Sequence, residues 1–350
     1  MTDLLDFVAL SLLPFWCRLR TAECLRAGDS SGLVLRRLLS DHWRDQPDYA
    51  SALRGQAAAA MSRADANAIA ALSWTDIAYP VALSTIGDPP PLLWTRGRTD
   101  ALGLPSVAIV GSRAASPYGL SVAEQLAADL AARGLVVVSG LARGIDSAAH
   151  RGALAGGGAT IAVLGSGIDV MYPPEHATLA AEIAVEGAVV SEFVPGTLPQ
   201  PWCFPLRNRI ISGLARAVVV IEAGEKSGSL ITARCALEQG RDVLAVPGNV
   251  LSGRNRGAHA LLRDGARIVE SADDILEELG MAPRPPSARA PTADPVLACL
   301  ALGEACDLDL ISERSGLPTS RLLPRLFELE LEGHVRRAGG GRFVRIDRTC

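Results

Sequence analysis

The sequence predicts an α/β protein in which an extended Rossmann-like parallel sheet forms the core, with a helical domain before it and a winged-helix domain after it. Six apolar runs of strand length alternate with helix-length segments between residues 107 and 246, as in a sheet that is buried on both faces. Aromatic residues make up only 4% of the chain, which suits helices on a parallel sheet better than a β-sandwich. A Pro-rich stretch then separates a short last unit.

The first two parts are predicted at residues 1–75 and 76–280. In the N-terminal helical domain, Leu35, Leu38 and Leu39 recur at helical spacing and the Ala-rich run 57–60 follows. The bridge 79–93 carries Pro80 and three consecutive prolines, so irregular structure is expected there. The strands of the parallel sheet are expected at 107–110, 135–138, 160–164, 188–190, 217–221 and 243–246, with a further one at 267–270.

A linker and a third domain are expected at residues 281–293 and 294–350. Five prolines between 282 and 295 predict a semi-extended linker. Helices near 296–302, 308–315 and 319–332 and a hairpin around Gly339–Gly341 predict a winged helix. Pro324 lies inside the third helix, where it is expected to bend or shorten it.

Composition limits the class of function. The net charge of −4 gives no overall basic signal, so a nucleic-acid site has to be a local patch. The seven cysteines form no C-x-x-C motif, which indicates scattered thiols in a reducing compartment. No acidic or histidine cluster predicts a metal site, and no apolar stretch is long enough for a membrane span. A cytoplasmic protein without metal and without membrane contact is expected.

Gly- and Ser-rich loops follow most of the predicted strands. In an open parallel sheet ligands bind at the carboxyl ends of the strands, and glycine lets backbone N–H groups approach an anion. Three of the loops also carry a cation, namely Arg113, Arg143 and Lys226, the only lysine of the chain. The loops together predict a phosphate pocket made of Gly111, Ser112, Ser139, Gly140, Gly165, Ser166, Gly167, Ser227, Gly228 and Ser229.

The segment after the fourth of these strands combines rings with cations. Residues 194–221 contain no acidic residue, while Trp202 and Phe204 stand close to Arg207 and Arg209. Bases can stack on such rings while arginines hold phosphates, so the segment is similar to a single-strand binding surface. The alternative is a hydrophobic lid whose arginines form salt bridges.

In order and spacing, these motifs resemble the DNA-processing protein A (DprA/Smf) family over roughly residues 75–280. The resemblance lies in the stretches Gly111–Arg113, Ser139–Asp146 with Ala149-His150, Gly165–Asp169 with Tyr172-Pro173, Phe204-Pro205, Arg207–Gly213, Glu222–Thr232, Ala245–Gly248 and Gly265-Ala266. The first 75 residues lack the Gly-hydrophobic-Gly turn of the family's N-terminal domain, so the resemblance does not extend a DNA-binding role to them.

The resemblance implies a homodimer that binds single-stranded DNA without sequence preference. It also implies that the protein helps to load the RecA recombinase onto DNA taken up in natural transformation, with no catalysis and no cofactor. It places Arg113, Phe204, Arg207, Arg209 and Lys226 in the DNA groove. Arg143 and Asn208, in the same loops, complete the predicted DNA-binding set.

Two other classes of function are weighed against this one. The first is a protein that binds or cleaves a nucleotide-derived small molecule, similar to Rossmann-like phosphoribohydrolases. Those carry a Gly-Gly-x-Gly-Thr motif with a catalytic Glu two residues later, whereas here Glu222 precedes the turn 224–231. The second is an adaptor that works through the winged helix, for which both protein contact and duplex binding are open.

Overall fold

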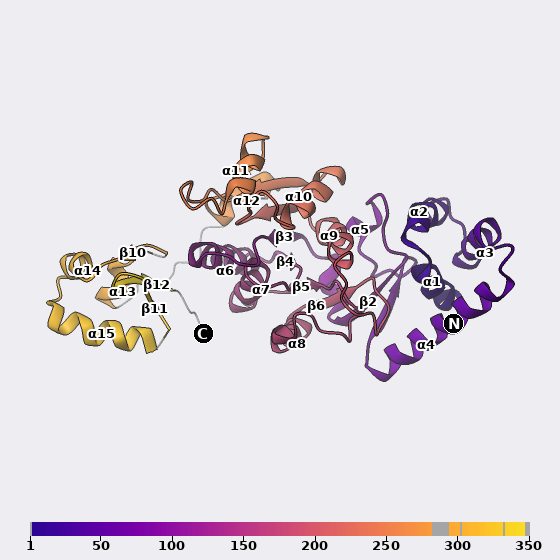
Figure 1. The fold of residues 1–350 in the computed structure, drawn as a ribbon, viewed down its shortest axis with the longest axis horizontal. Coiled ribbons are helices and arrows are strands. Elements are labelled where there is room, and N and C mark those ends of the chain that lie inside the picture. Colours follow the sequence, from indigo (N-terminus) through magenta and orange to yellow (C-terminus); the bar gives the residue numbers. More distant parts are fainter. Residues whose placement is uncertain (1, 282–293, 302, 332, 347–350) are drawn as a thin grey trace.

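The computed structural model describes residues 2–281, 294–301, 303–331 and 333–346. An N-terminal helical domain, a sheet domain and a winged helix follow one another along the long axis (Figure 1). The predicted class, α/β with a large and mostly parallel sheet between these two flanking parts, is confirmed. Most of the predicted linker, residues 282–293, lies outside the described residues.

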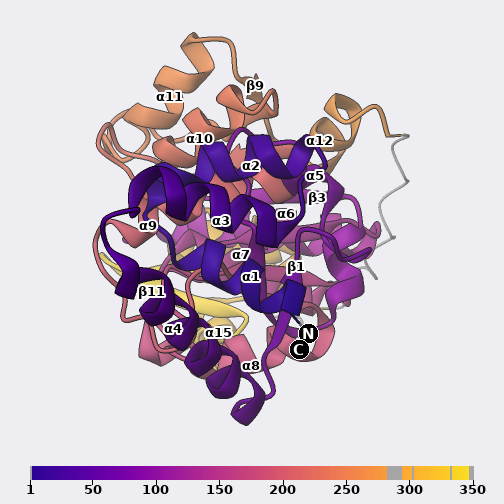
Figure 2. The same cartoon turned by 90° about the vertical axis from the view of Figure 1, so that its right-hand side faces the viewer.

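The N-terminal domain packs its helices against one end of the sheet domain (Figure 2). Buried side chains such as Phe7 and Leu38 share one apolar core with Trp94 of the sheet. The N-terminal domain and the sheet domain therefore have a common hydrophobic core. The domain consists of α1 (Thr2–Leu12), η1 (Phe15–Cys17), α2 (Arg18–Arg26), α3 (Ser31–His42) and α4 (Pro47–Ala66).

The central sheet has nine strands among the described residues, in the order β1-β2-β6-β5-β4-β3-β7-β8-β9. Strands β3 to β9 are parallel to one another, whereas β2 pairs antiparallel with β1 and β6. The strands are β1 (Ala70–Ser73), β2 (Leu92–Gly97), β3 (Ser106–Val110), β4 (Val136–Ser139), β5 (Thr160–Val163), β6 (Ala188–Ser191), β7 (Ala217–Val220), β8 (Asp242–Ala245) and β9 (Arg267–Ile268).

Two strands differ from the prediction. Strand β1 lies in the range expected to be helical, and β2 begins inside the bridge expected to be irregular. The bridge also contains one helical turn, α5 (Val81–Ser84). Leu92 and Leu93 of β2 face different cores and are both fully buried, so β2 is an apolar run like the other strands. The three prolines directly before it mask the strand signal.

Helices cover both faces of the sheet. On one face lie α6 (Pro117–Ala132), α7 (Ile145–Ala155), η3 (Pro174–His176), α8 (Ala177–Glu186) and α12 (Ala272–Glu278), and on the other lie α5, η2 (Thr99–Gly103), α9 (Cys203–Leu214), α10 (Ser229–Glu238) and α11 (Arg256–Arg263). From β3 the chain moves outward to β4, β5 and β6, then returns to β7 beside β3. The switch point between β3 and β7 is where such a fold binds ligands.

The winged helix packs around its own small core, which includes Leu322, Leu326 and Phe343. Pro324 lies within α15, which nevertheless continues to Leu331, so the expected shortening is not observed. The elements are α13 (Pro295–Cys299), β10 (Ala305–Cys306), α14 (Leu308–Ser315), α15 (Thr319–Leu331), β11 (Val335–Ala338) and β12 (Arg342–Arg345). Within the described ranges, no helix combines the length and the apolar character that crossing a bilayer requires.

Candidate nucleic-acid interface

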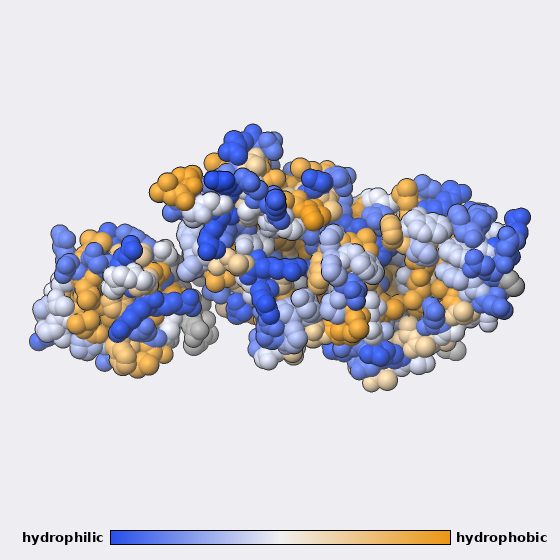
Figure 3. All heavy atoms as spheres, in the orientation of Figure 1, coloured by the Kyte–Doolittle hydropathy of each residue, from blue (hydrophilic) through white to orange (hydrophobic). Residues whose placement is uncertain are grey.

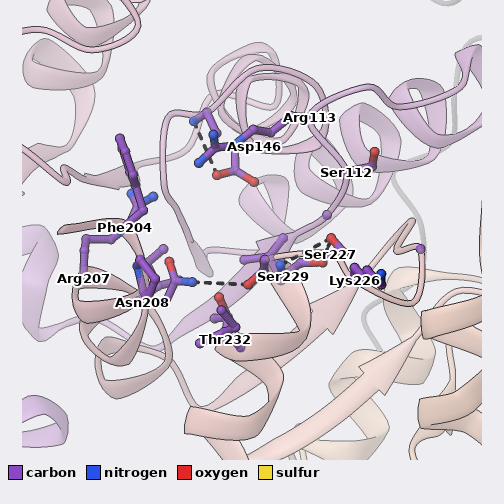
Figure 4. A pocket seen from close by; sticks show the side chains of 18 of the residues that line it. Ser112, Arg113, Asp146, Phe204, Arg207, Asn208, Lys226, Ser227, Ser229 and Thr232 are labelled. Carbon is purple, nitrogen blue, oxygen red and sulfur yellow. Dashed lines mark hydrogen bonds between the residues drawn. The ribbon is translucent and has the colours of Figure 1, made fainter. Parts of the chain in front are cut away.

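A cavity of about 860 Å³ opens at the switch point between β3 and β7. The loops after β3, β4 and β7 contribute to its lining, and α9 closes one side (Figure 4). Arg113, Arg207 and Lys226 line it together with a single carboxylate, Asp146. The cavity therefore carries an excess of positive charge although the whole chain is acidic.

The loops after β3 and β7 are tied to each other beneath the cavity. The Ser112 N–H donates to the Glu222 carbonyl at 2.7 Å. The Glu222 carboxylate accepts from Ser116 N–H at 3.2 Å and from Ser116 Oγ at 2.5 Å, and Ser116 caps α6 by accepting from Gly119. A Cβ on Gly111 would come within 2.5 Å of the Ile145 side chain, so only glycine lets the chain pass here.

Three side chains form an aromatic and cationic side of the cavity. The Arg113 guanidinium lies 5.1 Å from the centroid of the half-buried Phe204 ring. The Tyr172 ring lies 5.5 Å from Phe204 at an interplanar angle of 43°. A Cβ on Gly165 would come within 2.8 Å of Phe204, so this glycine makes room for the ring. A ring with an adjacent cation is suited to a stacked base and its phosphate.

The opposite side of the cavity is the start of α10. Lys226 is exposed, and the Ser227 and Ser229 hydroxyls lie 2.7 Å apart. Asn208 of α9 reaches across and donates from Nδ2 to the Gly228 carbonyl at 3.3 Å. A helix N-terminus with two hydroxyls and a lysine favours a bound anion. The cavity therefore has a ring on one side and phosphate-binding groups on the other (Figure 4).

The floor of the cavity holds one buried cation and one buried carboxyl. Arg207 donates from Nη1 to the carbonyls of Gly140, at 2.7 Å, and of Val163. Burial lowers the pKa of Arg207 to about 10, so it stays charged at neutral pH. Burial also raises the pKa of the Asp146 carboxyl, which accepts from the N–H groups of Gly140 and Ala142. Arg207 thus shapes the floor and adds positive potential, with its donors directed at carbonyls.

Five of the ten predicted phosphate contacts lie outside the cavity lining. Ser139 and Ser166 are buried and donate to the carbonyls of Ile109 and Val170, each at 2.6 Å. Gly140 lies against the Arg207 guanidinium, Gly165 against Phe204, and Gly167 against the carbonyl of Val194. Close packing explains why these positions are small. Gly111, Ser112, Ser227, Gly228 and Ser229 do line the cavity.

Two of the seven predicted DNA contacts are also placed elsewhere. Arg209 is buried on the far side of α9, where it meets the carboxylates of Glu192 at 2.5 Å and Asp88 at 3.1 Å. Arg143 is exposed and paired with Glu175. Arg209 therefore agrees with the alternative given for this segment, in which its arginines form salt bridges. The other five, Arg113, Phe204, Arg207, Asn208 and Lys226, are brought together around the cavity.

Several lining residues were not predicted from the sequence, among them Tyr172, Ile211 and Thr232. The helical periodicity of α9 would have predicted one of them, Ile211. Phe204, Arg207, Asn208 and Ile211 recur at spacings of three and four and share one face of α9, whereas Arg209 lies about 140° from Phe204. The sequence prediction assigns no helix to residues 194–221, and for this reason it does not separate the two faces of α9.

Titratable groups do not gather elsewhere in a way that indicates metal chemistry. Over the described ranges, no group of three or more His, Cys, Asp or Glu side chains is placed to hold an ion. His150, part of one of the sequence motifs, is fully buried and bonded to Thr160 at 2.7 Å. It lies on the buried face of α7, away from the cavity lining.

The fold and the site together define a Rossmann-like protein with an anion-binding cavity at its switch point. A family model described as DNA recombination-mediator protein A matches residues 70–280, and one described as the DprA winged helix domain matches residues 280–341. The chain therefore belongs to the DNA recombination-mediator protein A family, as its motifs indicate.

Individual relatives agree with this assignment. Protein Smf of Escherichia coli is 42% identical over 285 residues, which cover 78% of this chain and 76% of the relative. The structure of DNA processing protein A from Streptococcus pneumoniae is similar with a TM-score of 0.67 and 38% identity, over 78% of this chain and 95% of that one. The protein of Helicobacter pylori, described for its single-stranded DNA binding mode, matches with a TM-score of 0.55 and 31% identity, over 60% of this chain and 95% of that one.

Proposed function

We propose that this protein binds single-stranded DNA in the cavity at the switch point, without sequence preference and without catalysing a reaction. The observation that carries the proposal is the pairing of Arg113 with the Phe204 ring opposite Lys226 and the start of α10. Every base offers a face to a ring, so stacking tolerates any sequence. The cations and the helix N-terminus would hold the phosphates on either side of the stacked base.

The comparisons support the same proposal. The related protein of Helicobacter pylori is described as binding single-stranded DNA, and relatives in several bacteria are named DNA processing proteins. On the family resemblance we further propose that the chain acts as a homodimer, that it helps to load RecA, and that it serves DNA uptake by natural transformation.

Binding is tested by titrating labelled single-stranded oligonucleotides of different base composition into the full chain at several salt concentrations. We expect similar affinities for the different sequences and a logarithmic salt dependence with a slope of about −0.7 per phosphate contacted. Duplex DNA of equal length is the control. Equal affinity for the duplex, or no dependence on salt, would contradict the proposal.

The two partner proposals need separate measurements. Light scattering at several protein concentrations measures the mass of the particle, and a mass of one chain at all of them would exclude the homodimer. Capture of purified RecA by the immobilised chain, with and without single-stranded DNA, measures the second contact. Absence of capture in both conditions would exclude a direct role in loading.

A second candidate is a nucleotide-derived small molecule. The cavity volume of about 860 Å³ is within the range of ligand pockets. The acid that precedes the turn, Glu222, is buried and bonded to Ser116, and it does not line the cavity. We therefore expect incubation with AMP to leave the nucleotide intact, and calorimetry to show weaker binding of AMP than of an oligonucleotide. Release of adenine would favour the second candidate.

A further inference from the structure

Four charged side chains meet where the N-terminal domain contacts the sheet domain. Arg18 begins α2, Glu192 follows β6, Arg209 lies on α9, and Asp88 precedes β2. The Glu192 Oε2 atom lies 3.1 Å from Arg18 Nη2 and 2.5 Å from Arg209 Nη2, and the Asp88 carboxylate lies 3.1 Å from Arg209 Nε. We call these four residues the boundary cluster.

The boundary cluster is buried enough for its geometry to matter. The side chains of Glu192 and Arg209 are 3% and 7% exposed, and that of Arg18 is 16% exposed. Exposed ion pairs have little effect on structure, whereas loss of one partner of a buried pair leaves an uncompensated charge. Glu192 is shared by both guanidinium groups, so removal of Arg18 changes the balance around Arg209.

Arg209 links the boundary cluster to the DNA site through α9. On this helix it lies about 140° from Phe204, so one face holds the cluster while the opposite face lines the cavity with Phe204 and Asn208. The start of α9 has no side-chain cap. The ion pairs of Arg209 therefore hold one side of α9, beside the apolar packing of Ile210 and Leu214, and a change in them would bear on the rotation of the helix and on the position of the ring.

We propose that the boundary cluster sets the rotation of α9, so that Arg18 of the N-terminal domain positions Phe204 and Asn208 for strand binding. Arg18, Glu192 and Arg209 are then positioning residues that do not touch DNA. This role explains a buried arginine beside a DNA site, and it gives the N-terminal domain a function that its own surface does not show. The inference rests on the single-strand binding proposed above.

The first test does not require DNA. Arg18→Met removes the charge and keeps the length of the side chain, and Arg20→Met is the matched control, because Arg20 lies on the same helix in an exposed pair with Glu23. Hydrogen exchange of the full chain should become about tenfold faster in α9 of Arg18→Met, a local opening effect. Exchange in α10 and α11, and throughout Arg20→Met, should match the unmodified chain.

The second test measures coupling in oligonucleotide binding. Arg18→Met should weaken binding about tenfold without changing the salt slope, because no phosphate contact is lost. Loss of Phe204 should matter less in the Arg18→Met background, since residues that act through one element are coupled. The effect of Lys226→Ala, on the other side of the cavity, should be additive.

The outcomes separate the two proposals. If the unmodified chain binds no oligonucleotide, the proposed function fails, and the exchange of α9 still decides the role of the boundary cluster. Unchanged exchange in α9, or an equal increase over the whole sheet domain, would overturn the positioning role. So would a salt slope reduced by one phosphate. Should Arg18→Met not fold, Arg18→Lys, which keeps the charge but loses the forked geometry, should show a smaller increase confined to α9.

Discussion

Two regions of this molecule occupy positions that nucleic-acid-binding folds commonly use, and they differ in chemistry. At the switch point of the sheet, Arg113 and Lys226 are exposed beside a half-buried ring. In the winged helix, the outward face of α15 carries Leu323, Phe327 and Leu331, which are exposed and recur every four residues. The first region combines a ring with exposed charges, which a phosphate backbone requires, whereas this stripe of α15 is apolar.

The same contrast holds for Arg325 of α15. Arg325 is paired with Asp294 at 2.6 Å and with Glu328 at 2.6 Å, so its charge is balanced within the domain. The exposed cations of this domain include Arg336 and Arg342 on the hairpin. An apolar stripe on the recognition-type helix is suited to protein contact rather than to a DNA groove (Figure 3). The side chains that each region presents, rather than its position in the fold, therefore indicate what it can bind.

The largest effect should come from removing both exposed cations of the cavity. Arg113→Ala/Lys226→Ala should weaken single-strand binding by at least about 100-fold at low salt, because each charged contact contributes about 1.5–3 kcal/mol. The salt slope should become shallower by about 1.4 for two lost phosphates. Fluorescence anisotropy measures both quantities. Arg20→Ala/Arg98→Ala, with the same change in net charge at exposed pairs far from the cavity, is the control and should bind almost normally.

Phe204→Ala should have the next largest effect on binding. Loss of a stacked base costs about 1–3 kcal/mol, and the salt slope should stay unchanged, because the ring carries no charge. The thermal unfolding midpoint of the variant serves as the control for folding. A variant that binds normally but unfolds earlier would show that Phe204 is only a packing residue on α9.

The third prediction concerns the stability of the sheet domain at low pH. Burial lowers the pKa of His150 from its ordinary value of 6.5 to about 3, so the folded chain keeps it neutral while the unfolded chain takes up a proton. The free energy of unfolding should therefore fall as pH falls below about 6.5, by about 1.5 kcal/mol between that pH and pH 5.

Tryptophan fluorescence in guanidinium measures this loss in the right part of the chain, because all five tryptophans precede residue 203. His150→Gln should show a weaker pH dependence than the unmodified chain. An unchanged dependence would mean that other groups cause the loss. The winged helix contains no tryptophan, so this fluorescence signal reports the N-terminal and sheet domains and not the winged helix.

The sequence predicted the parallel strands well because each is a short apolar run that ends in a Gly- or Ser-rich loop, as at Val110-Gly111. It did not predict β1 and β2. The apolar run from Leu92 to Trp94 directly follows three prolines, which indicate irregular structure. Antiparallel edge strands that join the sheet from outside the repeating pattern depend on tertiary packing, here against β6.

For the site, residue type predicted which loops matter but not which way each side chain faces. Arg207 and Arg209 are equivalent in composition, yet one helix turns them to different sides of α9. Gly165 has the same type as Gly111, but it supports the Phe204 ring instead of lining the cavity. The orientation of a side chain follows from the helical period and from packing. A prediction from residue types alone therefore includes residues that do not line the cavity.

The smallest effect on single-strand binding should come from substitutions in the winged helix. Leu323→Ser/Phe327→Ser/Leu331→Ser removes the apolar stripe of α15 while leaving its buried face, Leu322, Leu326 and Leu329, intact. Exposed substitutions of this kind each change stability by only about 0.5 kcal/mol, so single-strand affinity and its salt slope should stay within about twofold of the unmodified chain. The titration used for the cavity variants measures this directly, and Leu326→Ser, which disrupts the core of the domain, shows what its unfolding does. A loss of affinity comparable to that of Phe204→Ala would mean that strands also contact α15, because removing an apolar surface weakens binding only where a base or sugar packs on it.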